Sequence, residues 1–177
     1  LPPYTANPSG GGKSGSPAQL QAGVTTWMTL YLTDEYYNVV SATTPFLAVS
    51  SNNPVIQVDF PNDANIQLRG MHATPYQKSL ISGTTTFPVI PVTRNQSSGL
   101  TVQVTDTGMA NGTFFSTDTV TGIIVNPAEA VSILLLVPTE TASEGAVGGK
   151  TGTAGPLTAG TTYTISARAV DVYGNLT

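Results

Sequence analysis

Cysteine is absent from the chain, and charged residues are scarce, at 9% of the 177 residues. Without cysteine the protein has no disulfide bond and no thiolate metal site. An average globular protein carries about 25% charged residues, and a free monomer usually needs surface charge to stay soluble. Charge is also depleted at the cores of interfaces, so we expect a surface largely covered by neighbouring subunits or by glycans.

Basic residues and long apolar runs are also rare. Six Lys and Arg against ten Asp and Glu give a net charge of −4, which leaves no basic footprint for nucleic acid. The longest apolar run, residues 133–137, is far shorter than the roughly 20 residues that span a bilayer. We therefore expect neither a nucleic-acid partner nor a membrane span. The chain begins with Leu1 and carries no signal-peptide pattern, so we expect a processed or partial chain.

One stretch of the sequence occurs twice. Residues 11–40 align without a gap to residues 148–177, at an offset of 137. Such self-similarity is typical of repeat architectures. Leu1-Pro2 falls opposite Val137-Pro138 if one residue is gapped. We therefore expect residues 1–128 to form a repeat that lacks its N-terminal strand, and residues 129–177 to form the first strands of a second repeat or a donor segment. The identical pairs include Lys13/Lys150, Leu20/Leu157, Ala22/Ala159, Gly23/Gly160, Asp34/Asp171, Tyr36/Tyr173 and Asn38/Asn175.

Alternation within the repeated stretch predicts a half-buried strand at residues 24–33. Met28, Leu30 and Leu32 lie on the face expected to be buried, as does Ile165 in the second copy. Trp27 and Tyr31 lie on the opposite face. The Asp-x-Tyr-x-Asn sequence that follows predicts a tight turn, because Asp and Asn hydrogen-bond their own backbone.

Further short strands are expected along the rest of the chain. Leu100, Val102 and Val104 alternate cleanly and should face inward. Residues 84–93 carry two prolines, which restricts them to an edge strand or a bulge. The unbroken apolar run at 132–137 indicates burial on both faces, whereas residues 1–19 are expected to be a crossing loop. The strand candidates are residues 39–50, 55–60, 66–69, 84–93, 99–106, 119–125 and 132–137. This succession predicts an all-β fold, an immunoglobulin-like β-sandwich of about seven strands.

The order of several short motifs resembles bacterial immunoglobulin-like tandem repeats, similar to filamin-type and invasin-type modules of large secreted or surface-anchored proteins. The resemblance covers nearly the whole chain and departs from the family at residues 54–82. It implies a structural or adhesive role at the cell surface or outside the cell, without enzymatic activity. The motifs are Ala22-Gly23, Asp34, Tyr36 and Asn38, then residues 82–87 (SGTTTF), residues 100–106 (LTVQVTD) and residues 124–128 (IVNPA).

Catalytic and nucleotide-binding signals are weak. The Gly10-Gly11-Gly12-Lys13-Ser14 segment invites a phosphate-loop interpretation, but that motif needs a glycine five residues before the Gly-Lys pair, where Asn7 stands, and a following helix. A glycine-rich crossing loop is the favoured interpretation. His72 is the one histidine, and no nucleophile elbow accompanies it. We expect no catalytic centre and no cofactor.

Two further kinds of site have candidate residues. Asp34, Asn38, Asp171 and Asn175 offer oxygen ligands for calcium, although turn chemistry alone explains them as well. Asn95, Asn111 and Asn175 each begin an Asn-x-Ser/Thr glycosylation pattern.

Exposed aromatic residues mark contact surfaces, so Trp27 and Tyr31 are candidates for a self-assembly interface. The alternative is that a loop of the same unit, such as residues 70–82, covers them. The run Ile133, Leu134, Leu135, Leu136 and Val137 joins them as an interface candidate, because an unpaired apolar strand readily adds to another chain.

Together these patterns favour a structural subunit of an extracellular filament, sheath or surface layer. The expected contact is head-to-tail, with residues 130–177 docking onto the N-terminal region of a neighbouring copy; covalent continuity of a longer repeat chain would give the same contact. An adhesion module that binds a glycan or a protein at its loop tips, and an accessory domain of a secreted enzyme, are the alternatives.

Overall fold

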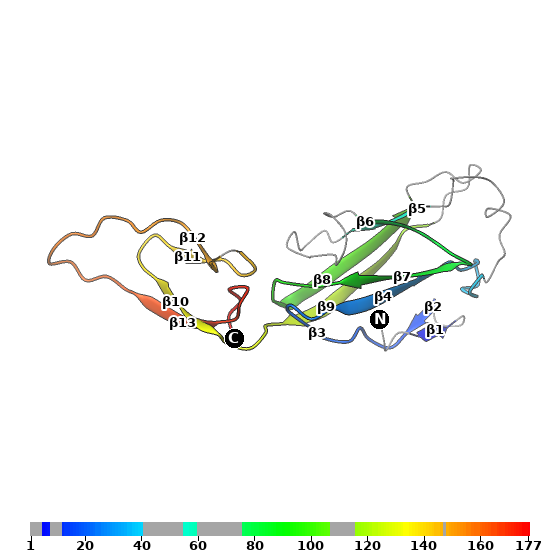
Figure 1. Cartoon of the computed structure of the whole chain (residues 1–177), viewed down its shortest axis with the longest axis horizontal. Helices are drawn as coiled ribbons and strands as arrows, with labels where there is room; N and C mark the ends of the chain where they lie inside the picture. The colour runs from blue at the N-terminus through cyan, green and yellow to red at the C-terminus, as the bar shows by residue number, and fades with distance from the viewer. Residues whose placement is uncertain (1–4, 8–11, 41–54, 60–75, 107–115, 147) are drawn as a thin grey trace.

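A computed structural model describes residues 5–7, 12–40, 55–59, 76–106, 116–146 and 148–177 (Figure 1). Within these residues every regular element is a strand, so the expected all-β class is confirmed. The strands are β1 (Thr5–Asn7), β2 (Gly12–Ser14), β3 (Leu20–Gln21), β4 (Thr26–Tyr31), β5 (Val55–Asp59), β6 (Tyr76–Ser79), β7 (Thr84–Val89), β8 (Asn95–Asp106), β9 (Asp118–Asn126), β10 (Ser132–Leu136), β11 (Thr141–Ala142), β12 (Lys150–Thr151) and β13 (Ser166–Val170).

The first unit places two sheets around one core. The larger sheet has the order β3-β9-β8-β5-β6, and the smaller pairs β4 with β7. Side chains from both sheets meet between them and form one buried cluster, with Leu30, Val104 and Val120 packed against it. This is a sandwich-like arrangement of two packed layers. The cluster consists of Leu20, Met28, Phe87, Val89, Leu100, Val102, Ile123 and Val125.

The alternation in the sequence located much of this core, since Leu100, Val102 and Met28 are buried as expected. Leu30 and Leu32, for which the same pattern predicts burial, are half-buried. Strand β7 contains Pro88 and pairs only with β4 among the described strands, as expected of an edge strand. Strand β8 begins earlier than the expected residue 99, because Asn95 already pairs with Val125 of β9, and the register then shifts before Leu100. The candidate strand at 66–69 and most of the candidate at 39–50 lie outside the described residues.

The second unit contains the two-stranded sheet β10-β13 (Figure 1). Leu134, Leu136 and Val170 form a small buried cluster on one face, with Ala142 and Leu176 packed against it. On the other face Ile133 is 76% exposed and Leu135 52% exposed. The prediction that this run is buried on both faces is therefore wrong, because the described part of the chain places no second sheet over that face.

Ile165 shows the same effect. Its counterpart in the first unit, Met28, is buried under the larger sheet, whereas Ile165 is 55% exposed. The prediction that Ile165 is buried is therefore also wrong. Ala167 and Ala169 stand opposite Leu135 and Ile133 and are exposed as well. We call Ile133, Leu135, Ile165, Ala167 and Ala169 the bare face.

Near each start of the repeated stretch the described residues form paired strands, which the expected crossing loop did not include. Strand β1 pairs with β2, and β11 pairs with β12 in the second unit. Gly12 has a φ of +87° and a Cβ there would lie 2.3 Å from the Tyr37 ring, so glycine allows both the backbone conformation and the close approach. Short polar strands of this kind lack the apolar alternation on which the sequence prediction depended.

Two residues of β9 that lie two positions apart differ in burial, so substitutions at them should differ in their effect on the free energy of unfolding. Ile123 is fully buried and Thr121 is exposed. Ile123→Ala should lower the free energy of unfolding by about 2–5 kcal/mol, because the lost contacts leave a cavity. Thr121→Ala, the matched control, should change it by no more than about 0.5 kcal/mol. Urea denaturation followed by circular dichroism measures both, and equal losses would contradict this placement of the core.

Candidate functional site

The Asp-x-Tyr-x-Asn sequence forms the same turn in both units. In the first, Asp34 Oδ1 accepts the backbone N–H groups of Tyr36 and Asn38, and Asp34 Oδ2 accepts the Asn38 side-chain amide at 3.0 Å. In the second, Asp171 makes the same three bonds with Tyr173 and Asn175. We call residues 34–38 the N-terminal turn and residues 171–175 the C-terminal turn.

The two turns also share their backbone conformation. The N–H of Asp34 donates to the Asn38 carbonyl, as Asp171 does to Asn175. The fourth residue has a positive φ in each case, +62° at Tyr37 and +76° at Gly174. The side-chain carboxylate thus supplies acceptors for the N–H groups that a tight turn leaves without a backbone partner.

The surroundings of the two turns differ. Asp34 and Asn38 are exposed, whereas Asp171 is 2% and Asn175 0% exposed. The C-terminal turn is buried because it lies against the end of the first unit, close to the C-terminus in Figure 1. Its polar side chains must therefore be hydrogen-bonded, since an unpaired buried polar group costs about 1–3 kcal/mol.

The first unit supplies those hydrogen bonds from its backbone. The Arg94 N–H donates to Asn175 Oδ1 at 2.9 Å, and Asn175 Nδ2 donates to the Val92 carbonyl at 2.8 Å. The Ala128 N–H donates to Asp171 Oδ2 at 2.8 Å. The Tyr173 ring covers Gly23, where an added Cβ would lie 2.5 Å from the tyrosine hydroxyl oxygen. We call Gly23, Val92, Arg94 and Ala128 the socket.

A salt bridge lies beside the socket and joins the same two units. Arg94 Nη2 and Nε contact the two carboxylate oxygens of Glu144 at 2.5 and 2.9 Å. This bidentate pair is partly buried, which makes its geometry more specific than that of an exposed pair. The turn, the socket and the salt bridge together fix how the second unit meets the first.

Sequence reasoning identified the turns but not the socket or Glu144. The socket acts through two backbone N–H groups, one carbonyl and a missing side chain, and none of these leaves a residue-type pattern. The signal that was available is the identity of Gly23/Gly160, Asp34/Asp171, Tyr36/Tyr173 and Asn38/Asn175, since these are the residues at the contact.

The calcium candidates are engaged in the hydrogen bonds of these turns, the Asp carboxylates as acceptors and the Asn side-chain amides as donors to them. Asp171 accepts four N–H groups, and the described residues contain no group of three or more His, Cys, Asp or Glu that could hold a metal ion. Of the glycosylation candidates, Asn175 is fully buried, and Asn95 is half-buried with its amide donating to the Gly99 carbonyl. Asn111 lies outside the described residues.

The phosphate-loop candidate is a strand residue with a partner. Lys13 lies in β2, and its Nζ contacts Asp118 Oδ2 of β9 at 2.6 Å. Its counterpart Lys150 lies in β12 and contacts Glu140 at 2.9 Å. His72 lies outside the described residues.

The interface candidates divide into three groups. Trp27 and Tyr31 are exposed in β4, so their predicted outward face is confirmed. Leu134 and Leu136 are buried within the second unit, and Val137 is half-buried. Ile133 and Leu135 belong to the bare face. The structure thus leaves four of the seven candidates available for contact.

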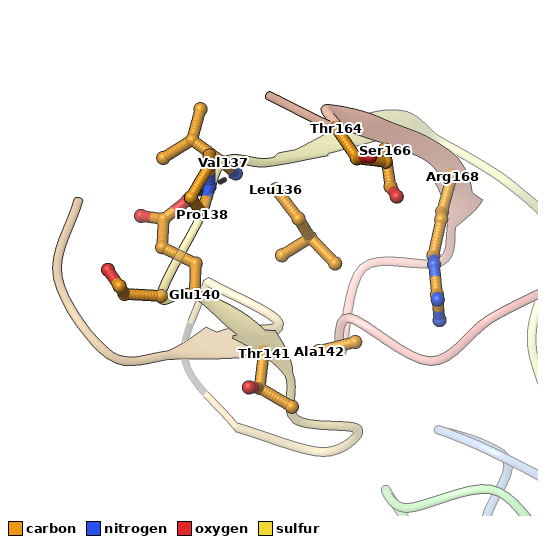
Figure 2. A pocket seen from close by; sticks show the side chains of 10 residues that line it. Leu136, Val137, Pro138, Glu140, Thr141, Ala142, Thr164, Ser166 and Arg168 are labelled. Atoms are coloured by element: carbon orange, nitrogen blue, oxygen red, sulfur yellow. Dashed lines mark hydrogen bonds between the residues drawn. The ribbon is translucent and has the colours of Figure 1, made fainter. Parts of the chain in front are cut away.

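A hollow of about 350 Å³ lies in the second unit. Figure 2 shows Leu136 in its middle, with Thr164, Ser166 and Arg168 on one side and Thr141 and Ala142 on another. Its carboxylate, Glu140, already accepts hydrogen bonds from Lys150 and from the Val137 N–H. These contacts hold the pKa of Glu140 below its ordinary value. The hollow therefore belongs to the packing between β10-β13 and the hairpin β11-β12.

No family model, curated protein or solved structure matches this chain. No helix among its described residues is long and apolar enough to cross a membrane. The function is therefore argued from the geometry of the two turns and of the strand edges.

The buried and exposed turns provide a matched pair of substitutions. Asn175→Ala should lower the stability of the junction by about 1–3 kcal/mol, because the Val92 carbonyl and the Arg94 N–H lose their partners. Asn38→Ala removes the same side chain from an exposed turn and should cost clearly less. Hydrogen exchange at the Arg94 amide, with urea denaturation of both variants, measures the difference. Equal behaviour of the two variants would show that the socket does not hold the turn.

The exposed turn also predicts a pH dependence. The side-chain amide and N–H of Asn38, with the N–H of Tyr36, hold the pKa of the Asp34 carboxyl below its ordinary value. These bonds therefore stabilise the folded chain above the unfolded pKa of about 3.9, and this contribution is lost as pH falls through the lower folded pKa. An NMR titration should place the Asp34 midpoint below about 3.9, and Asn38→Ala should raise it. An unchanged midpoint in the variant would contradict the assignment.

Proposed function

We propose that the chain is a structural subunit of an extracellular filament, sheath or surface layer, whose immunoglobulin-like repeats join through β-strand contacts. One observation carries the proposal. Strand β13 pairs with β10, whereas the equivalent strand β4 pairs only with β7 among the described strands. The first unit therefore has an open position where the second unit has a strand.

The open edge of β4 is the one that matches the paired edge of β13. The Leu32 N–H donates to the Gly83 carbonyl across the β4–β7 pair, so even-numbered residues of β4 face β7. The backbone groups of Trp27, Thr29 and Tyr31 consequently face away from β7. In the second unit their counterparts at 164, 166 and 168 include Ser166 and Arg168, which stand opposite Leu136 and Leu134 of β10.

Side chains at this edge suit an added strand. Trp27 and Tyr31 are exposed there. A β10 segment that leaves its own β13 partner, against which Leu134 is buried, would place Leu134 opposite Tyr31 if it kept the β10 register. An aromatic–aliphatic pair across two strands contributes about 0.2–1 kcal/mol. The added strand would also satisfy the backbone groups of the β4 edge that no described strand pairs.

Two further properties support assembly. The bare face presents five apolar residues, and one of them, Ile165, occupies the position that Met28 fills as a buried residue in the first unit. Charged residues make up only 9% of the chain, which suits a surface covered by neighbours. Pairing of β10 of one copy with β4 of another joins two different surfaces. Such a heterologous contact can propagate into a filament.

Strand addition predicts protection of particular amides. A synthetic peptide of residues 130–138 with a lysine tail should bind the chain and slow hydrogen exchange at the amides of Trp27, Thr29 and Tyr31. The reason is that these N–H groups would donate to the added strand. NMR-detected exchange measures each amide separately.

The control peptide carries Leu134→Pro, which removes a ladder donor and should not protect these amides. Negative-stain microscopy of the concentrated chain provides the second readout and should show elongated assemblies. Protection that is equal with both peptides, or absent with the first, would overturn strand addition at β4.

A further inference from the structure

We infer that the N-terminal turn is a second docking element, which enters the socket of another copy of this chain in exchange with that copy's own C-terminal turn. The structure displays the contact once, where the C-terminal turn fills the socket. The same element occurs a second time, exposed, 137 residues earlier. This contact goes beyond strand addition at β4 and does not rest on it.

The residues that meet the socket are identical in the two turns. Asp171, Tyr173 and Asn175 make every socket contact described above, and their counterparts are Asp34, Tyr36 and Asn38. The two positions that differ point elsewhere. Val172 is exposed, and Gly174 packs against Gly149 of its own unit. The differences, Glu35 for Val172 and Tyr37 for Gly174, therefore leave the docking surface unchanged.

Within the described residues, the N-terminal turn leaves unused the hydrogen-bonding positions that the C-terminal turn uses for the socket. Among the described residues, Asp34 Oδ2 accepts one hydrogen bond, from Asn38, whereas Asp171 Oδ2 accepts that bond and a second from Ala128. Within the same residues, Asn38 Nδ2 donates to Asp34, whereas Asn175 Nδ2 donates to both Asp171 and Val92. These acceptor and donor groups of the N-terminal turn are those that the socket would complement.

The tyrosine of each turn and the glycine that it can cover also differ in burial between the two units. Tyr173 lies over Gly23, and Tyr36 is 66% exposed. Gly160, the counterpart of Gly23 in the second unit, has nothing within 4 Å of its Cβ position. An exposed tyrosine and an uncovered glycine thus occur wherever the described chain brings no partner to these positions.

A second copy carries the complete socket, but its own C-terminal turn occupies it. That turn is covalently tethered, and its effective concentration is in the millimolar range. Exchange at micromolar concentration is therefore rare in the wild-type chain. Weakening the resident turn opens the socket to the N-terminal turn of another copy.

The test mixes ¹⁵N-labelled wild-type chain with unlabelled Asn175→Ala chain, up to about 1 mM. Asn175 belongs to the second unit, whose buried cluster is separate from the core of the first unit. The first unit of the Asn175→Ala chain, which carries the socket, should therefore stay folded. We expect saturable chemical-shift changes at the amides of Tyr36 and Asn38. Unlabelled wild-type chain, whose socket is filled, should cause at least tenfold smaller changes at the same concentration.

The reverse labelling provides the second measurement. In labelled Asn175→Ala chain, the amides of Arg94 and Ala128 should shift on addition of wild-type chain and not on addition of Asn38→Ala chain. Tyr173→Ala removes the ring that covers Gly23, so this variant is a second, independent chain with an opened socket. Shifts confined to Trp27, Thr29 and Tyr31 would support strand addition and overturn this docking. Absence of shifts at Tyr36 and Asn38 with both the Asn175→Ala and the Tyr173→Ala chains would also overturn docking of the N-terminal turn.

Discussion

The buried carboxylate of Asp171 and the amide of Asn175 impose the strictest constraint on this protein. Both groups are almost fully buried, so each hydrogen bond they need has to be present. Three backbone groups of the first unit, at Val92, Arg94 and Ala128, meet that need. The position of the second unit is consequently fixed by hydrogen-bond geometry in addition to the Arg94–Glu144 pair.

Equivalent residues of the two units have different burial because a partner surface, and not the strand itself, decides what is buried. Met28 and Ile165 occupy the same position of the repeat, yet only Met28 lies under a second sheet. The same holds for Asn38 and Asn175, which differ only in what lies against them. An edge or surface that is open in one unit and occupied in the other is therefore where we propose that a partner fits, at β4 and at the N-terminal turn.

Sequence pattern was sufficient where side chains alternate. The inward positions of β8 and the outward position of Trp27 follow from residue type at a period of two, and the edge character of β7 follows from its proline. The hairpin β1-β2 could not be predicted, because its polar and glycine residues carry no such alternation. The exposure of Ile133 and Ile165 could not be predicted either, since it depends on a covering sheet. The socket consists of backbone groups, which every sequence contains.

Recognition through backbone groups has a consequence for a repeat protein. The socket uses the carbonyl of Val92 and the N–H groups of Arg94 and Ala128. Most residue types provide these backbone groups at such positions. The turn instead depends on particular side chains, since only Asp, Tyr and Asn make its contacts. Within this chain the turn trio and the socket glycine are indeed the same in both copies, while many neighbouring positions differ. A unit built in this way can change most of its surface and still dock end to end, because the few side chains that set the contact remain the same.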